Sequence, residues 1–109
     1  MTGTSMDGVD ISLINTNGTD FVKIKCEKSY KFNTNYQNII NNLIINKPKT
    51  NNKIKEYFLK KDDFVTDILE KKIILFLKQK KINKKNIDLI SISGQTVYHD
   101  PSNKISIQL

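Results

Sequence analysis

The 109-residue sequence contains no Arg, no Trp, a single Cys, a single His and only two Pro. Because Cys26 is the only cysteine, an internal disulfide and a metal cluster built from several cysteines are excluded, and we expect a small buried thiol within a strand. No apolar run is long enough to cross a bilayer, and the chain does not open with a basic stretch followed by an apolar one. We therefore expect a cytoplasmic protein with no membrane partner.

The absence of Arg weakens the function that the charge would otherwise suggest. A net charge of +7, with 18 Lys against 11 Asp and Glu, is typical of a nucleic-acid-binding surface. Proteins that read bases and phosphates, however, rely on the planar fork of the Arg guanidinium. Lys, Ile and Asn make up nearly half of the chain, which indicates a genome-wide compositional bias. We expect no nucleic-acid partner, and keep a basic nucleic-acid-binding module only as an alternative.

Length and hydrophobic periodicity predict one α/β domain. Alternating apolar residues predict strands over 9–14 and 21–32, joined by a hairpin turn at Asn17-Gly18 with positive φ angles. A helical period runs from Asn33 to Pro48, and a longer one from about 53 to 81. Within the second, Lys61 and Lys72 fall on the apolar stripe, which indicates either a break near 60–63 or Lys stems that reach past the rim.

Two further strands are expected toward the end of the chain. Residues 87–93 read as a buried strand that leads into a polar cluster, and 104–109 read as a strand that stops without a turn. A chain that ends within a strand leaves an unpaired edge. We therefore expect a truncated domain of low solubility.

The first candidate site lies at the start of the chain, where two of the four glycines flank Thr4-Ser5-Met6-Asp7. Small residues with backbone N–H groups and hydroxyl side chains form concave nests for phosphate oxygens. A carboxylate in such a nest would be repelled by phosphate unless a divalent cation lies between them, so Asp7 favours a Mg²⁺-nucleotide. The spacing matches neither a P-loop nor a dinucleotide-binding loop, and an ordinary turn before a strand explains the pattern equally well.

The second candidate site is Ser93-Gly-Gln-Thr-Val-Tyr-His-Asp-Pro101, which holds the only His. Gln95 and Thr96 offer amide and hydroxyl groups to sugar hydroxyls, Tyr98 offers a ring for stacking, and His99 beside Asp100 offers an oriented imidazole. On these residues alone a structural turn is the better explanation, because Asp-Pro is a turn signal and a lone His before it usually makes a structural hydrogen bond.

Together the two segments resemble one protein family. Thr2-Gly-Thr-Ser-Met-Asp-Gly-Val-Asp10 is similar to the MSGTSMDGVD signature of the anhydro-N-acetylmuramic acid kinases, and Ser93 to Pro101 resembles their HGQTVWHxP segment. Ile105-Ser-Ile-Gln-Leu109 is similar to their TLQIG strand. The resemblance spans the chain, although the specific matches cover only its two ends.

The resemblance implies a fold, a reaction and a set of site residues. The fold would be α/β, the ribonuclease H-like N-terminal lobe of a two-lobe actin-like ATPase, truncated at both ends, with residues 1–109 as a partial lobe and no second domain. The reaction would be ATP-dependent phosphorylation of the 6-oxygen of 1,6-anhydro-N-acetylmuramic acid, coupled to opening of the anhydro bridge by water in cell-wall recycling. ATP and Mg²⁺ would be the cofactors, an amino sugar the small-molecule partner, and a homodimer is left open for the full-length protein. The implied ATP-binding residues are Gly3, Thr4, Ser5, Met6, Asp7, Gly8, Val9 and Asp10, with Asp7 also at the metal, and the implied sugar-binding residues are Gln95, Thr96 and His99.

Three departures from the family pattern limit what the resemblance implies. Ser93 stands where the family usually has His, and Tyr98 stands where Trp is common. The chain begins at the Met of the signature and stops before the DTGPGN-type segment that supplies the catalytic Asp, so no catalytic residue is assigned. We expect the chain alone to bind ATP weakly and to phosphorylate no sugar. A non-catalytic actin-like module, with a nucleotide-binding or assembly role, is the alternative.

Overall fold

The computed structural model describes residues 6–109, apart from the side chains of residues 51 and 52 in one helix. Along the chain, one antiparallel hairpin precedes the helices and a second one follows them. The elements are β1 (Gly8–Thr16), β2 (Val22–Lys31), α1 (Thr34–Ile45), α2 (Asn51–Leu59), α3 (Asp62–Gln79), the short 3-10 turn η1 (Lys84–Asn86), β3 (Thr96–Asp100) and β4 (Ile105–Gln108). The mixed α/β class expected from the sequence is confirmed. No helix in the described part of the chain combines the length and the hydropathy needed to span a membrane.

The β1–β2 hairpin is confirmed, but its turn differs from the one expected. The strands pair in antiparallel register from Gly8 opposite Lys31, with an irregularity between Leu13 and Ile14. Only Gly18 has the positive φ predicted for the Asn17-Gly18 pair, at 80°. The Asn17 side chain instead holds a wider loop, because its oxygen accepts hydrogen bonds from the backbone N–H groups of Thr19 (3.1 Å) and Phe21 (3.0 Å).

Polar residues mark the start of α1 and the boundary between α2 and α3. Asn33 caps α1, since its side-chain oxygen accepts a hydrogen bond from the backbone N–H of Tyr36 at 2.9 Å. Of the two alternatives left open for Lys61 and Lys72, the structure shows a break near 60–63: α2 ends at Leu59 and α3 starts at Asp62. Just past the end of α2, Lys60 pairs with Glu56 at 2.8 Å on the exposed side.

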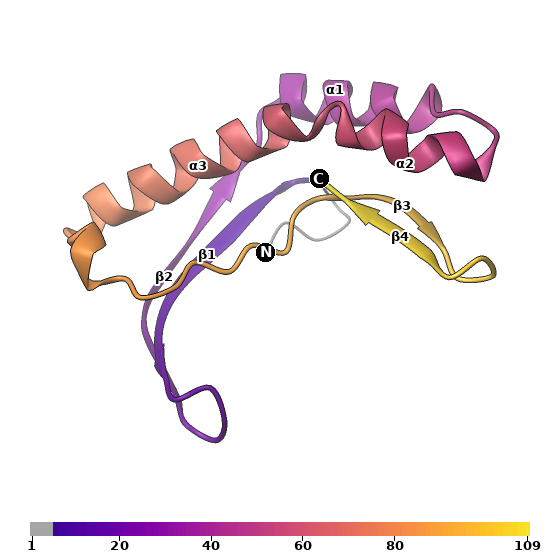
Figure 1. Ribbon diagram of the computed structural model, residues 1–109. Coiled ribbons are helices and arrows are strands. Elements are labelled where there is room, and N and C mark those ends of the chain that lie inside the picture. The colour runs from indigo at the N-terminus through magenta and orange to yellow at the C-terminus, as the bar shows by residue number, and fades with distance from the viewer. Residues whose placement is uncertain (1–5) are drawn as a thin grey trace.

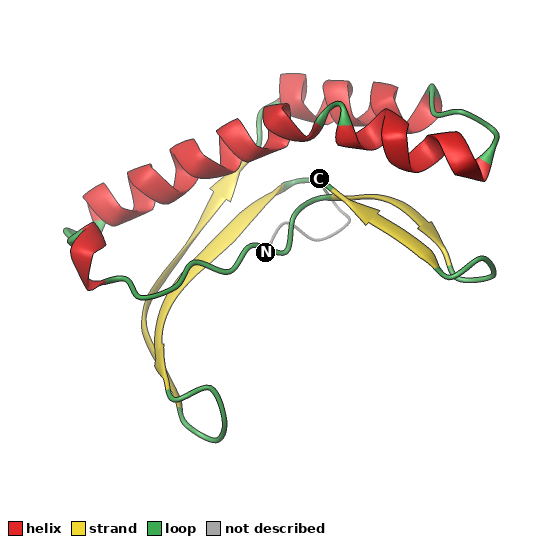
Figure 2. Ribbon diagram, in the orientation of Figure 1, coloured by secondary structure: helices red, strands yellow, loops and turns green. Residues whose placement is uncertain are grey.

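The helices form one layer, and both hairpins lie along the same side of that layer (Figures 1 and 2). The core between them is largely aromatic at its centre, where the rings of Phe32 and Tyr36 lie 4.0 Å apart and those of Tyr36 and Phe64 lie 5.8 Å apart. Cys26 lies in β2, as expected, and packs against this core, but it is half-buried and not fully buried. The buried apolar residues are Val9, Tyr30, Phe32, Tyr36, Ile40, Ile54, Phe58, Val65, Leu69, Phe76, Val97, Ile107 and Leu109.

The prediction of a strand over residues 87–93 is wrong. This segment forms no ladder with another strand of the described chain, and three of its apolar side chains are largely exposed: Leu89 by 82%, Ile90 by 56% and Ile92 by 57%. Its composition favours a strand, but a strand is stable only with a partner that satisfies its backbone groups. The described residues place no such partner beside it.

The second hairpin begins at Thr96, two residues after Gly94. The strand expected near 104–109 is confirmed as β4, and it pairs antiparallel with β3, where His99 lies opposite Ser106. Gly94 has a φ of 67°, and a Cβ atom there would lie 2.5 Å from the carbonyl oxygen of Leu109. Both the backbone conformation and the available space therefore require glycine at this position.

We predict that Gly94→Ala destabilises the fold more than Gly18→Ala. Both glycines have positive φ, but an added Cβ at Gly18 meets no atom within 4 Å. Gly18→Ala should therefore cost only the backbone strain, roughly 1–2 kcal/mol. Gly94→Ala should cost at least about 1 kcal/mol more because β4 must shift. Urea unfolding of both variants measures the difference, and equal losses would contradict the close approach to Leu109.

Candidate functional site

The two motifs found in the sequence are held by neighbouring residues in the first turns of α1. Gln37 donates a hydrogen bond from Nε2 to the backbone oxygen of Met6, at 3.1 Å. The hydroxyl of Tyr36 donates to Oε1 of Gln95, at 3.5 Å. Segments that are almost ninety positions apart in the sequence are thus attached to the same end of one helix. This is the region in which we place the candidate site.

The described part of the first motif starts at Met6, so Gly3, Thr4 and Ser5 lie outside the described residues. Met6 has a φ of 54°, which is unusual for a residue with a side chain. The backbone oxygen of Asp7 accepts a hydrogen bond from the N–H of Phe32 at 2.9 Å, while the residue itself is exposed. The backbone is therefore fixed by β2 and α1, and Asp7 remains at the surface.

Gly8 and Val9 serve the packing of the hairpin. A Cβ at Gly8 would lie 2.5 Å from the carbonyl oxygen of Tyr30, so glycine allows β2 to come close. Val9 is 5% exposed and belongs to the core. Two of the residues implied as ATP contacts thus have structural roles in this fold, and their ATP contact stays a prediction.

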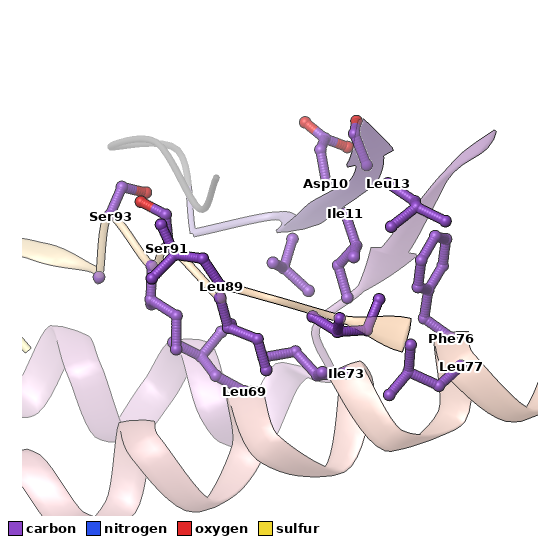
Figure 3. A pocket seen from close by; sticks show the side chains of 16 residues that line it. Asp10, Ile11, Leu13, Leu69, Ile73, Phe76, Leu77, Leu89, Ser91 and Ser93 are labelled. Carbon is purple, nitrogen blue, oxygen red and sulfur yellow. The ribbon is translucent and has the colours of Figure 1, made fainter. Parts of the chain in front are cut away.

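Asp10 presents its carboxylate on the face of β1 that points away from α3 (Figure 3). The residue is exposed, and its Oδ1 accepts a hydrogen bond from the hydroxyl of Ser29, its partner across the hairpin, at 2.5 Å. A serine that donates to the carboxylate orients it.

Gln95, expected as a sugar contact, lies in the core with none of its surface exposed. Its backbone exchanges two hydrogen bonds with Leu109, at 2.6 and 2.9 Å, and its side-chain nitrogen donates to the backbone oxygen of Thr96 at 3.4 Å. Together with the bond from Tyr36, these contacts satisfy a polar side chain that would otherwise be costly to bury. In this structure Gln95 is positioned as a support beneath the motif.

Thr96 and His99 lie on β3, nearer to solvent. The Thr96 hydroxyl accepts a hydrogen bond from Nε2 of Gln108 at 3.5 Å, and His99 is exposed. The hydroxyl and the imidazole are thus separate from the amide of Gln95, which faces α1. The three expected sugar contacts are close in sequence, but the structure places them in different surroundings. Gln95 is buried, Thr96 is half-buried and His99 is exposed.

Tyr98 and Asp100 form a local polar cluster at the tip of this hairpin. The Tyr98 hydroxyl donates to Asp100 at 3.2 Å, and Nζ of Lys47 lies 6.0 Å from the centre of the Tyr98 ring. The side chain and then the backbone N–H of Asn103 donate to Asp100 and lower the pKa of its carboxyl. Asp100 is therefore engaged in the turn, and the expected pairing with His99 is replaced by pairing with Tyr98 and Asn103.

A groove of about 340 Å³ runs between β1, α3 and the segment 87–94 (Figure 3). The two motifs share its edge, since Asp10 lines it from one side and Ser93 and Gly94 line it from the other. The rest of the lining is mostly apolar. Gln95, Thr96 and His99 do not line this groove.

The described residues contain no group of three or more His, Cys, Asp or Glu side chains that could hold a metal ion. Asp7 offers an exposed carboxylate. Mg²⁺ is often held by one or two carboxylates, with phosphate oxygens and waters as its other ligands. The donor set fits a metal that arrives with a nucleotide better than a metal held by the protein alone.

Sequence reasoning missed Tyr36 and Gln37. Tyr36 falls on the apolar side of the helical period that begins at Asn33, and its hydroxyl also binds Gln95. The place of Gln37 in the first turns of a helix does not predict its hydrogen bond to the backbone oxygen of Met6. No feature of spacing could have found either contact, because both partners lie far away in the sequence.

We predict that Tyr36→Phe lowers stability and flattens its dependence on alkaline pH. Burial raises the pKa of Tyr36 to about 12, against an ordinary value of about 10. The contribution of Tyr36 is fully present below about pH 10 and is lost as pH rises through about 12, because the unfolded chain releases the proton first.

At neutral pH, Tyr36→Phe should cost about 1–3 kcal/mol, since Oε1 of Gln95 loses a donor. Urea unfolding at pH 7 and across pH 9–12 tests both effects. Tyr57→Phe is the matched control, because the Tyr57 hydroxyl makes no hydrogen bond among the described residues. A pH profile of Tyr36→Phe identical to that of the unchanged chain would contradict the assignment.

Comparison with known proteins assigns the chain to a family. The family model described as anhydro-N-acetylmuramic acid kinase matches residues 1–109. Proteins named anhydro-N-acetylmuramic acid kinase from Pelagibacter ubique and Sulfurimonas denitrificans are 33% and 32% identical over 116 and 111 residues, and one from Brucella canis is 24% identical over 111 residues.

Each of these matches covers the whole of this chain but only part of the relative. The share is 29% of the Pelagibacter protein, 28% of the Sulfurimonas protein and 30% of the Brucella protein. The chain thus spans less than a third of the length of these relatives. Because the family model matches from the first residue to the last, and both motifs lie within the match, the chain belongs to the anhydro-N-acetylmuramic acid kinase family.

Proposed function

We propose that this chain is the part of an ATP-dependent kinase that carries the nucleotide-phosphate loop and one wall of the sugar site. The match of the family model to residues 1–109 is the observation that carries the proposal. We further infer that it forms part of the ribonuclease H-like N-terminal lobe of an actin-like ATPase, and that the kinase works in the cytoplasm. The antiparallel β1–β2 hairpin with helices packed on one side supports this lobe.

On the nucleotide side, we propose that residues 3–10 bind the ATP phosphates. The backbone between Met6 and Gly8 is fixed by hydrogen bonds from Gln37 and Phe32. Such fixation supports phosphate binding because a loop that is already ordered loses little entropy when it binds. Asp7 would hold Mg²⁺ together with phosphate oxygens, and the metal would supply charge neutralisation at the transferred phosphoryl group.

On the sugar side, we propose that Thr96 and His99 contact the amino sugar and that Gln95 positions them from the core. Thr96 and His99 belong to β3, which starts directly after Gln95. Because Gln95 is bound to α1 and to the end of β4, β3 is held in one place relative to Met6. The two sides of the site would therefore keep a constant separation.

The reaction that we propose follows the name of the relatives. The terminal phosphoryl group of ATP passes to the 6-oxygen of 1,6-anhydro-N-acetylmuramic acid, the bond from C1 to that oxygen breaks, and water supplies the hydroxyl at C1. The products are ADP and N-acetylmuramic acid 6-phosphate. Catalysis of phosphoryl transfer depends mainly on positioning and on stabilisation of charge, which are the roles proposed for residues 3–10.

We predict that Asp7→Asn in the full-length kinase lowers Mg²⁺-dependent kcat by at least about tenfold, since a neutral amide is a weaker ligand for a hard cation. The assay measures ADP formed from ATP only when the anhydro sugar is present. Asp67→Asn is the control, because Asp67 is an exposed residue of α3 with no hydrogen bond among the described residues. Unchanged kinetics in Asp7→Asn, with the fold intact by circular dichroism, would remove the metal role.

We also predict that the 109-residue chain alone forms no ADP from ATP and the anhydro sugar. The chain covers only 29% of the Pelagibacter relative, and no catalytic residue is assigned within it. The measurement is ADP release by the purified chain with and without sugar. Sugar-dependent release above the rate of a sample without protein would show that these residues suffice.

A further inference from the structure

The side chain of Gln37 connects α1 to the first motif. Its Nε2 donates a hydrogen bond to the backbone oxygen of Met6 at 3.1 Å, and the residue is half-buried. The donor belongs to a neutral amide, so it brings no charge near Asp7. The contact therefore acts on the backbone one residue before the carboxylate proposed to hold Mg²⁺.

Met6 depends on such a contact because its backbone is strained. Its φ of 54° lies in the left-handed region, which is unfavourable for a residue with a side chain. A strained conformation persists only where neighbouring groups hold it, and such residues concentrate at ligand sites. The next residue is held as well, since the N–H of Phe32 donates to the backbone oxygen of Asp7 at 2.9 Å. The direction in which the Asp7 side chain leaves the backbone thus depends on both contacts.

The end of α1 that carries Gln37 is well anchored. The side chain of Asn33 caps the helix at the N–H of Tyr36, and the backbone oxygen of Asn33 accepts a hydrogen bond from the N–H of Gln37 at 3.3 Å. Tyr36 and Ile40, on the same part of the helix, are only 2% and 0% exposed. Because a capped and closely packed turn moves little, Gln37 presents its amide to Met6 from a fixed position.

Tyr36 contacts the other motif. Its hydroxyl donates to Oε1 of Gln95 at 3.5 Å, and its ring packs against Phe32 and Phe64. Among the described residues, neither Tyr36 nor Gln37 makes a side-chain hydrogen bond to both motifs. Consecutive residues of one helical turn therefore hold different motifs.

We propose that Gln37 is a positioning residue for the nucleotide. Through Met6 it sets the direction of Asp7, and so the affinity for Mg²⁺-ATP, whereas Tyr36 acts through Gln95 on the sugar side alone. This role rests on the proposed binding of ATP by residues 3–10. It adds that two adjacent side chains of α1 set the affinities for the two substrates separately.

Gln37→Met tests the contact in the ligand-free full-length kinase, where the result depends on neither ATP nor sugar. Met has a similar length but lacks the donor. The N–H of Phe32, which is bound to Asp7, should exchange hydrogen at least about threefold faster in this variant, because the bond opens more often. Gln37→Lys keeps an N–H donor and should retain the slow exchange. Asn38→Met is the matched control, because Asn38 is exposed and makes no side-chain hydrogen bond among the described residues.

Substrate affinities separate positioning from a general loss of structure. Gln37→Met should raise the KM for Mg²⁺-ATP by about fivefold or more, the scale of one neutral hydrogen bond, and leave the KM for the anhydro sugar unchanged. The Kd for Mg²⁺ with the non-hydrolysable analogue adenylyl imidodiphosphate, measured by calorimetry without turnover, should rise by the same factor. Tyr36→Phe should do the reverse, with a raised KM for the sugar and an unchanged Kd for the analogue.

The outcomes distinguish this role from the kinase assignment. If the unchanged full-length protein forms no sugar-dependent ADP, the kinase assignment fails and the nucleotide role fails with it, although exchange at Phe32 still reports the contact of Gln37 with Met6. With an active kinase, the positioning role is overturned if Gln37→Met binds the analogue like the unchanged protein. It is also overturned if Asn38→Met has the same effect, or if either α1 variant raises both KM values together.

Discussion

The buried amide of Gln95 is the contact on which the rest of the arrangement depends. The side chain has no exposed surface, and its oxygen accepts a hydrogen bond from Tyr36 while its backbone pairs with Leu109. An amide that is buried without partners would cost several kcal/mol, so these bonds fix the geometry around it. They join α1, the start of β3 and the end of β4 at one point. Gly94 makes the junction possible, because any side chain there would meet the carbonyl oxygen of Leu109.

The same end of α1 also holds the first motif, through Gln37 and the backbone of Met6. The two segments that resemble motifs of the family are therefore attached to the same helix. Under the proposed function, this arrangement would keep the phosphate loop and the sugar wall at a constant separation while the reacting groups are aligned. Asp7 remains at the surface, and Asp10 is held by Ser29 across the hairpin.

Much of the fold could be predicted from the sequence, because it depends on local patterns. Alternating apolar residues identified both strands of the first hairpin and β4, and the helical period with its polar break located α1, α2 and α3. The failure at 87–93 has a physical cause. A strand is defined by hydrogen bonds to a neighbour, and the composition of a segment carries no information on whether a neighbour is beside it.

The sequence by itself determined the family, the order of the elements as far as α3 and the residue types at the two motifs, because these depend on residue identity and on spacing along the chain. Only the tertiary structure decided that Gln95 is buried while Thr96 and His99 are nearer to solvent, and that Gly8 and Gly94 are needed for close approach of neighbouring strands. It also decided that Tyr36 and Gln37 support both motifs. The reason is that burial and contact are set by residues distant in sequence, which periodicity along the chain does not reveal.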